Sequence, residues 1–401
     1  MPTTPEPLSW PHSHRDPSDP INPAPELARI RSAQPVFGVP RPLPTGGSLT
    51  MWLITKYADA RELLSSRDTS NSLGRSQSAA AQPGFLASLD PPDHTRIRRM
   101  LTGQFSMRRL NTMRPYIEEI TTQFLDQMEA TGPPVDLMQA FALPLPSLVI
   151  CDLLGVPFED QAEFQRRSDT MLDVFVTPQQ QAENTREMNA YMASLVNRHR
   201  QDPGDDILGM LIRDHAGELT DEELIGIGNI LLVAGHETTS NTLGLGTLLL
   251  LQNPDQLALV RDDPELITGA VEEILRYLSI VHTGTPRIIL KDMIIGDHLL
   301  HAGDVAMVSL PSANRDSDFI ADPDVFQVTR QPQAHLTFGH GIHQCLGQQL
   351  ARLELSVALP ALLQRFPTLS WRCRYPISPS GEMVRSTAYG SCPYVGRPRD
   401  H

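Results

Sequence analysis

The clearest hydrophobic pattern in this chain is a long, mostly apolar stretch over residues 220–251. Thr220 and Glu223, at its start, have the spacing of a capping box, and Asn253-Pro254 follows its end. The pattern therefore predicts a single long helix. At about 1.5 Å per residue this helix would extend about 50 Å, and so would pass through the centre of a domain.

Shorter helical patterns precede and follow this stretch. A further helix should begin with Asp263 as its N-cap and Pro264 in its first turn, and should end near Tyr277. The other predicted helical segments are 25–32, 57–64, 346–366 and most of 90–200, with breaks near 133–134, 155–157 and 177–178.

Strand-like patterns are short, and they lie at 52–55, 286–290, 293–300 and 305–309. Residues 68–89 and 311–337 have no clear period, and a loop as long as the first of these is usually functional or mobile. Residues 1–25, rich in proline, predict a flexible tail ahead of a single domain over 26–401. The whole pattern predicts a mainly α fold with a small β portion.

Composition and charge narrow the class of protein. The net charge of −14 argues against nucleic acid as a partner. The longest apolar runs are too short to span a bilayer, and the N-terminal residues lack the apolar core of a signal peptide. Four scattered cysteines fit a reducing compartment. We therefore expect a soluble, cytoplasmic protein, a monomer that binds neither nucleic acid nor membranes.

The most informative segment is residues 338–347, with the sequence FGHGIHQCLG. It places Cys345 on a glycine-rich turn just before the predicted helix 346–366, where backbone N–H groups and the helix dipole stabilise a thiolate. Gly339, Gly341 and Gly347 allow a tight turn and the close approach of a large planar ligand. A thiolate ligand to haem iron requires such a setting.

Two other interpretations of this segment remain open. A lone cysteine is more often a small buried apolar residue than a ligand. Cys345 could also share a zinc site with His335, His340 and His343, although zinc would not explain the glycines.

The middle of the long predicted helix departs from its apolar pattern at Gly235, Glu237 and Thr238. A mid-helix glycine costs up to about 1 kcal/mol relative to alanine, and the polar side chains add a desolvation cost. Such departures are expected where a backbone approaches a ligand or where protons move. The alternative is an ordinary helix whose threonine bonds back to the preceding turn.

These motifs resemble, in this order and over roughly residues 25–395, the cytochrome P-450 family, most of all its soluble actinobacterial members. The resemblance implies the P-450 fold, with the long helix over a haem b group and the cysteine loop beneath it. It assigns the axial thiolate ligand to Cys345 and the close approach to the haem to Ala234 and Gly235. The remaining loop positions that match are Phe338, Gly339 and Gly347.

The resemblance also assigns two sets of charged residues. A buried structural network behind the haem matches Glu273, Arg276 and Arg330. The positions that bind the haem propionates match His94, Arg98, Arg287 and His343.

The implied function is a haem-thiolate monooxygenase, in which Glu237 and Thr238 help to deliver protons. It would insert one oxygen atom from O2, by hydroxylation or epoxidation, into a hydrophobic small molecule. Such a substrate would be a polyketide, macrolide or terpenoid intermediate of antibiotic or other secondary metabolism. Electrons would come from NAD(P)H through a ferredoxin reductase and a ferredoxin.

Two rival functions use the same fold. A peroxide-driven enzyme would not need the pair Glu237 and Thr238. A non-catalytic haem-binding accessory protein that activates a biosynthetic partner is the main alternative, although such proteins tend to lose the cysteine. By family position, the substrate pocket would include Phe85, Leu86, Val174, Val233, Ile280, Val281 and His282.

Overall fold

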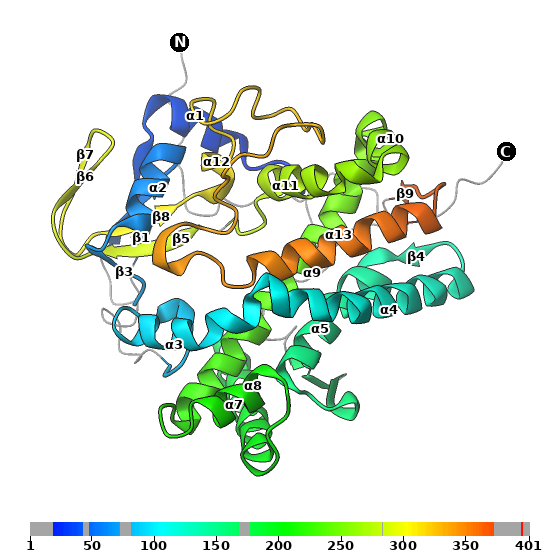
Figure 1. The fold of residues 1–401 in the computed structure, drawn as a ribbon. Coiled ribbons are helices and arrows are strands. Elements are labelled where there is room, and N and C mark those ends of the chain that lie inside the picture. Colours follow the sequence, from blue (N-terminus) through cyan, green and yellow to red (C-terminus); the bar gives the residue numbers. More distant parts are fainter. Residues whose placement is uncertain are drawn as a thin grey trace. The chain divides into compact units, whose positions relative to one another are not determined.

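The computed structural model describes residues 19–42, 48–72, 82–161, 163–164, 166–167, 177–282, 284–372 and 394–395. The chain divides into two compact units. Unit 1 comprises Met1–Ala79 and Glu272–Cys345, and unit 2 comprises Ala80–Val271 and Leu346–His401 (Figure 1). Among the described residues, no helix combines the length and the apolar character needed to cross a membrane. The division into a flexible tail and a single domain stays a prediction.

Unit 1 is built on a five-stranded sheet with the strand order β1-β2-β8-β5-β3. Strands β2 and β8 are parallel, and the other neighbours are antiparallel. Short helices flank the sheet, and the apolar side chains between them form a core that includes Ile54, Leu63 and Val308. The elements are α1 (Pro25–Ala33), β1 (Val36–Pro42), β2 (Ser48–Ile54), α2 (Tyr57–Ser65), β3 (Thr69–Ser70), β5 (Thr285–Ile289), β8 (Val305–Val308) and α12 (Leu310–Ala313).

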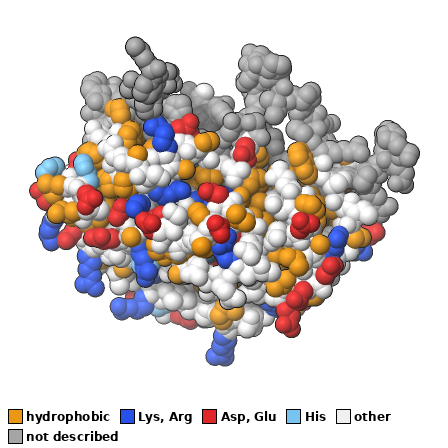
Figure 2. All heavy atoms as spheres, turned by 90° about the horizontal axis from the view of Figure 1, so that it is seen from above, with side chains coloured by type: hydrophobic (Ala, Val, Ile, Leu, Met, Phe, Trp, Pro, Cys, Tyr) orange, Lys and Arg blue, Asp and Glu red, His pale blue; other side chains and the backbone are white. Residues whose placement is uncertain are grey.

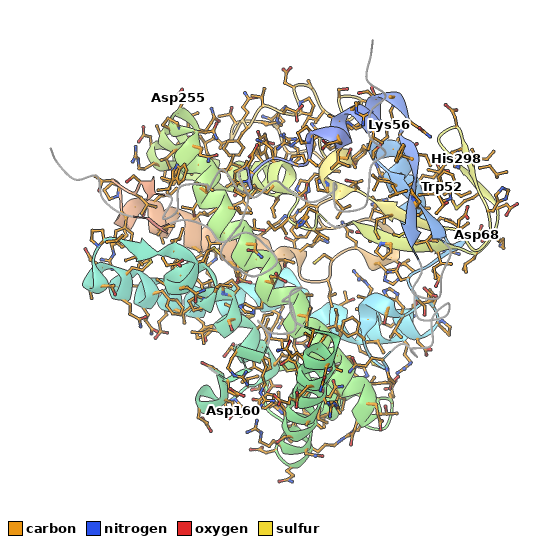
Figure 3. The ribbon with its side chains drawn as sticks, turned by 180° about the vertical axis from the view of Figure 1, so that it is seen from behind. Trp52, Lys56, Asp68, Asp160, Asp255 and His298 are labelled. Atoms are coloured by element: carbon orange, nitrogen blue, oxygen red, sulfur yellow. The ribbon has the colours of Figure 1, made fainter. Side chains whose placement is uncertain are left out.

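A hairpin of β6 (Met293–Ile295) and β7 (His298–Leu300) extends from unit 1, drawn in yellow in Figure 1. Gly296 makes its turn with a φ of 55°, a conformation that suits glycine. The ring of His298 lies against that of Trp52 in β2, with centroids 4.1 Å apart (Figure 3). This contact fastens the hairpin to the sheet.

Unit 2 is mainly helical. Helix α9 is its longest element, and α5, α7, α10 and α13 pack along it. Helices α4 and α13 also lie side by side (Figure 1). The helices are α3 (Asp93–Thr102), α4 (Met107–Thr131), α5 (Pro144–Leu154), α7 (Pro178–Gln201), α8 (Ile207–Asp214), α9 (Asp221–Gln252), α10 (Pro254–Asp262) and α13 (Gln348–Arg365), and α11 (Ile267–Leu278) begins in this unit and ends in unit 1.

A small three-stranded sheet completes the described part of unit 2, in the order β4-β10-β9. Its strands are β4 (Val135–Asp136), β9 (Trp371–Arg372) and β10 (Tyr394–Val395). A π-helical turn at Met138–Ala142 joins β4 to α5.

The predicted fold class and most predicted elements are confirmed. The capping box of α9 is present in full: the Thr220 side chain accepts from the Glu223 N–H, and the Glu223 carboxylate accepts from the Thr220 N–H. The predicted strand at 293–300 is the β6–β7 hairpin rather than one strand. Elements that the sequence pattern missed are α8, α10, α12, β1, β3 and the small sheet of unit 2.

Two glycines bring the segment before Leu86 against the start of α9. Gly84 has a φ of 78°, and a Cβ on it would collide with the backbone carbonyl of Glu223. A Cβ on Gly226 would collide with the carbonyl of Pro83 and would lie 2.9 Å from the backbone nitrogen of Phe85. The backbone of residues 83–85 and the backbone at the start of α9 therefore lie so close together that neither glycine position has room for a side chain.

Replacing Gly226 with alanine should destabilise the protein by about 1–3 kcal/mol, because the methyl group meets backbone rather than a movable side chain. Urea unfolding of the native protein and of the Gly226→Ala protein measures the difference in unfolding free energy. Gly103 is the control, since a Cβ there meets nothing within 4 Å. Equal stabilities of the Gly226→Ala and Gly103→Ala proteins would contradict the close approach.

Candidate active site

The cysteine loop of unit 1 is closed by backbone hydrogen bonds. The Cys345 N–H donates to the Phe338 carbonyl at 2.8 Å, and the Gly339 N–H donates to the Leu336 carbonyl at 2.8 Å. Gly339 and Gly341 have φ values of 68° and 76°, in the left-handed region that favours glycine. A Cβ on Gly341 would collide with the Leu64 carbonyl at the end of α2, whereas the space beside Gly339 is open.

Burial separates this cysteine from another one in the core. Cys151 in α5 is fully buried, and burial raises the pKa of its thiol to about 12, so it is unreactive at neutral pH. Cys345 is only partly buried. Of the two, Cys345 is the thiol that a ligand can reach.

The histidines proposed for a zinc site have other partners. His335 Nε2 lies 3.2 Å from a Glu272 carboxylate oxygen, and His340 Nε2 lies 3.3 Å from Arg61 Nε. The described residues contain no group of three or more His, Cys, Asp or Glu side chains placed to hold a metal ion. The geometry therefore does not support the zinc interpretation.

A buried ionic network in unit 1 joins the charged residues that the resemblance grouped. Arg276 is 1% exposed and binds Glu273 through two nitrogens, at 2.7 and 2.8 Å. Arg330 adds a third contact, from Nε to the Glu273 carboxylate at 3.2 Å. Arg276 also donates to the carbonyls of Asn314 and Pro323. One carboxylate and two guanidinium groups thus hold α11 against the irregular segment that follows α12.

The residues matched to propionate binding are divided between the units. Arg287 in β5 is buried, and His343 is partly buried in a 3₁₀ turn over Gly341–His343 of the cysteine loop; both belong to unit 1. His94 and Arg98 lie one turn apart on α3 of unit 2. Burial, assisted by the neighbouring Arg98 charge, lowers the pKa of His94 to about 4. His94 is therefore neutral at pH 7 and can still donate one N–H.

The middle of α9 is helical throughout, with side chains of mixed exposure. Residues 239–250 are all buried, but Ala234 is exposed and Glu237 and Thr238 are partly exposed. The Thr238 hydroxyl donates to the Ala234 carbonyl at 2.8 Å, which is the back-bonded arrangement considered from the sequence. A Cβ on Gly235 would collide with the end of the Ile150 side chain of α5, so packing against α5 also favours a glycine here.

The candidate pocket residues that the structure describes lie in both units. Phe85 and Leu86 stand at a 3₁₀ turn held against α9, and Val233 is partly buried within α9. In unit 1, Ile280 and His282 are buried, and Val281 packs against the core of the sheet. Val174 lies outside the described residues.

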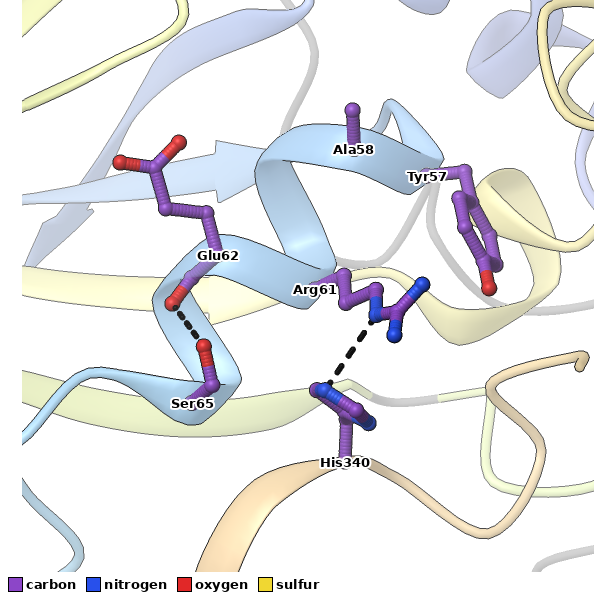
Figure 4. Close-up of a pocket in the computed structure, with 6 residues that line it drawn as sticks. All are labelled: Tyr57, Ala58, Arg61, Glu62, Ser65 and His340. Carbon is purple, nitrogen blue, oxygen red and sulfur yellow. Dashed lines mark hydrogen bonds between the residues drawn. The ribbon is translucent and has the colours of Figure 1, made fainter.

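An open pocket of about 490 Å³ lies beside α2 in unit 1. Arg61 and His340 point toward each other across it, while Glu62 points away (Figure 4). Burial and the Arg61 charge lower the pKa of His340, as expected for a ring nitrogen that accepts from a guanidinium. Cys345 is not among the residues that line this pocket, so the pocket is distinct from the cysteine site.

Acid should weaken the fold through His236, which is 1% exposed in α9. Burial lowers its pKa from 6.5 to about 4. The unfolded chain binds the proton below about pH 6.5 and the folded chain does not, so this contribution is complete above pH 6.5 and is lost as the pH falls toward 4. Between pH 7 and 4.5, His236→Gln should therefore reduce the loss of unfolding free energy in acid by about 2 kcal/mol.

Urea unfolding at several pH values between 7 and 4.5 measures this effect. The same substitution at His301, which is exposed, controls for the simple loss of a histidine. Parallel pH profiles for the native protein and His236→Gln would contradict the assignment.

Comparison with known proteins gives consistent matches. A family model described as Cytochrome P-450 matches residues 44–372. Cytochrome P-450-SU2 of Streptomyces griseolus is 42% identical over 375 residues, which cover 91% of each chain. Among solved structures, CYP105P1 in complex with filipin I has a TM-score of 0.85 and 36% identity, and covers 97% of this chain and 98% of its own. The P-450 StaH from glycopeptide antibiotic A47934 biosynthesis has a TM-score of 0.82 and 37% identity, with coverage of 96% and 99%.

Proposed function

This chain belongs to the cytochrome P-450 family, and we propose that it oxidises a hydrophobic intermediate of secondary metabolism. Membership makes it a haem-dependent oxidoreductase, a haem-thiolate monooxygenase that incorporates oxygen from O2 and receives electrons from redox partners. The proposal concerns the substrate, the electron donor and the roles of individual residues. The observation that carries it is the partly exposed Cys345 on a loop closed by its own backbone.

The residues present fit a haem group. A soft thiol stands on a loop with open space beside Gly339, and the other described cysteine is sealed in the core. Ala234 is exposed in a helix that is otherwise largely buried, as a small residue facing a bound ligand would be. Guanidinium and imidazole groups suited to carboxylates are present on α3, β5 and the cysteine loop.

Each residue then has a definite task. Cys345 would hold the haem iron through its sulfur and would donate electron density to it. Arg98, Arg287, His94 and His343 would hold the two propionates. Haem, when bound, supplies the oxygen-inserting chemistry, and the chain orients the substrate and manages protons.

Glu237 and Thr238 would manage those protons. Because the Thr238 hydroxyl donates its own proton to the Ala234 carbonyl, the oxygen keeps its lone pairs for accepting. Thr238 can therefore hold a proton donor such as water at a fixed place. The partly exposed Glu237 carboxyl, next to it in the sequence, can exchange protons with solvent.

Replacing Thr238 with alanine should lower product formation by about 10²-fold, because proton delivery becomes undirected. Oxygen should still be reduced, so NAD(P)H consumption continues and peroxide appears in place of product. Thr238→Ser should keep most of the activity. Thr242→Ala is the control, since Thr242 is also back-bonded, to the Thr238 carbonyl at 2.7 Å. Equal product yields from Thr238→Ala and Thr242→Ala would contradict the role.

A hydrophobic substrate is supported by the character of the candidate pocket residues. Phe85, Leu86, Val233, Ile280 and Val281 are all apolar, and His282 would fix a polar group. One similar protein was solved with filipin I, and another comes from glycopeptide antibiotic biosynthesis. These relatives support a natural product of antibiotic or related metabolism as the substrate, and hydroxylation or epoxidation as the reaction.

A ferredoxin and its NAD(P)H-dependent reductase are the electron donors we propose. On the face drawn in Figure 2, basic and acidic side chains are interspersed with apolar ones rather than gathered by sign. On this face, a docking partner would therefore rely on a few local ion pairs rather than on a patch of one sign.

The proposed function is tested on the purified holoprotein. The reduced, carbon monoxide-bound state should show the long-wavelength absorption band of a thiolate-ligated haem, and a panel of natural products should shift the ferric spectrum. Turnover of a hit should depend on added ferredoxin and reductase. A protein that shows the band, yet oxidises no binding compound and instead activates a partner enzyme, would be the accessory protein.

A further inference from the structure

Asn314 is a fully buried amide with three side-chain hydrogen bonds in unit 1. Its Oδ1 accepts from the Leu336 N–H at 2.6 Å. Its Nδ2 donates to the Ser279 hydroxyl at 2.8 Å and to the Thr337 hydroxyl at 3.0 Å. We call this arrangement the Asn314 clamp.

The directions of these bonds are fixed by the chemistry of the partners. The Leu336 N–H can only donate, so the amide oxygen must face it. The Ser279 hydroxyl donates to the Arg276 carbonyl at 2.9 Å, and the Thr337 hydroxyl donates to the Leu275 carbonyl at 2.8 Å. Both hydroxyl protons are therefore committed, and each hydroxyl oxygen accepts from an Asn314 amide N–H.

The clamp joins three segments that are far apart in the sequence. Leu275 and Arg276 lie in the last turn of α11, where the Leu275 carbonyl also accepts from the Ser279 N–H at 3.0 Å. Asn314 directly follows α12, and its backbone carbonyl accepts from the Arg276 guanidinium. Leu336 and Thr337 lead directly into the cysteine loop.

From these two residues the hydrogen bonds continue to the cysteine. The Leu336 carbonyl accepts from Gly339, and the carbonyl of Phe338, the residue after Thr337, accepts from the Cys345 N–H. Asn314 thus holds Leu336 and Thr337, which precede the loop. Phe338, the next residue, in turn holds the backbone of Cys345.

We propose that Asn314 is a positioning residue for the Cys345 thiolate, acting through Leu336, Thr337 and Phe338. The inference rests on the proposed role of Cys345 as the haem ligand. If the clamp loosens, the Phe338 carbonyl no longer fixes the Cys345 backbone, and the sulfur would no longer be held at the place where it could bind the haem iron. The clamp therefore maintains the ligand state in addition to the fold.

The test uses the holoprotein and a pair of matched variants at Thr337. Thr337→Val has nearly the same shape but removes the hydroxyl, and Thr337→Ser restores it. The readout is the rate at which the long-wavelength band of the reduced, carbon monoxide-bound protein is lost at neutral pH. Thr337→Val should raise this rate about tenfold, the factor that one buried hydrogen bond corresponds to, and Thr337→Ser should return it to the native value.

A general loss of stability is controlled by Leu27→Ala. Leu27 is buried in α1 within a separate apolar cluster of unit 1 and touches no member of the clamp by hydrogen bonding. This variant should melt at a lower temperature but keep the native rate of band loss. If Thr337→Val keeps that rate as Leu27→Ala does, the clamp is only structural and the inference is overturned.

If the Thr337→Val protein does not fold, the Asn314→Asp variant tests the same inference. It keeps an acceptor for Leu336 but removes both N–H donors, and should also speed loss of the band; an unchanged rate overturns the inference. A native protein that never shows the band would instead refute the proposed function itself, so the two failures are distinguishable.

Discussion

Replacing Cys345 with alanine is expected to abolish the thiolate-ligated spectrum and to lower turnover at least about a thousandfold, equivalent to roughly 4 kcal/mol of barrier. The reason is that the sulfur would supply both the bond that holds the haem iron and the electron donation to that iron. Absorption spectra of the reduced, carbon monoxide-bound protein and single-turnover assays measure the two effects.

Cys151→Ala is the matched control for this substitution. Cys151 is fully buried in α5, and its raised pKa keeps it a neutral thiol. Its removal should cost some stability but leave the spectrum and the turnover rate unchanged. If the Cys345→Ala protein retained the native spectrum, or Cys151→Ala lost it, the assignment of the ligand would be wrong.

Replacing Glu273 with glutamine is expected to destabilise the protein by about 3–5 kcal/mol, because it leaves the charge of buried Arg276 without a counter-ion. Arg330 would lose its carboxylate partner as well. Because the network holds the segment after α12, haem retention should fall together with the unfolding free energy. Urea titration and the haem-to-protein absorbance ratio measure both.

Glu163→Gln is the control, because Glu163 belongs to a second network of one carboxylate and two guanidinium groups. It also binds two arginines, Arg166 and Arg167, but its side chain is 47% exposed. Glu163→Gln should therefore leave the unfolding free energy close to that of the native protein. Similar losses from the Glu163 and Glu273 variants would show that burial of the network is not what makes it stabilising.

Local sequence rules predicted the helices well where capping residues mark their ends. Thr220 and Glu223 define the start of α9, and Asp263 accepts from the Glu265 N–H at the start of the turn that leads into α11. Helix α10 was missed because Pro254 was interpreted only as the end of α9, although proline also favours the first turn of a new helix. Strand β1 was missed because it contains Gly38, Pro40 and Pro42, and only its pairing with β2 makes it a strand.

The site could be predicted only where its partners are close in sequence or match a known motif. Glu273 and Arg276 stand three residues apart on one helix face, and their pairing is confirmed. Asn314 carries no such signal, because its partners lie 35, 22 and 23 residues away in an irregular stretch. The interpretation of Gly235 as a site of ligand approach stays a prediction, and its contact with Ile150 is a further packing role that no local pattern could reveal.

The close approach between Gly84 and Gly226 has a consequence for efforts to change the substrate range by directed evolution. Because neither position accepts even a methyl group, the backbone that carries Phe85 and Leu86 is locked in register with α9. Selected libraries should therefore collect substitutions in the side chains at 85 and 86, while positions 84 and 226 return almost only glycine. In this part of unit 2, new specificity would come from reshaping side chains on a fixed backbone.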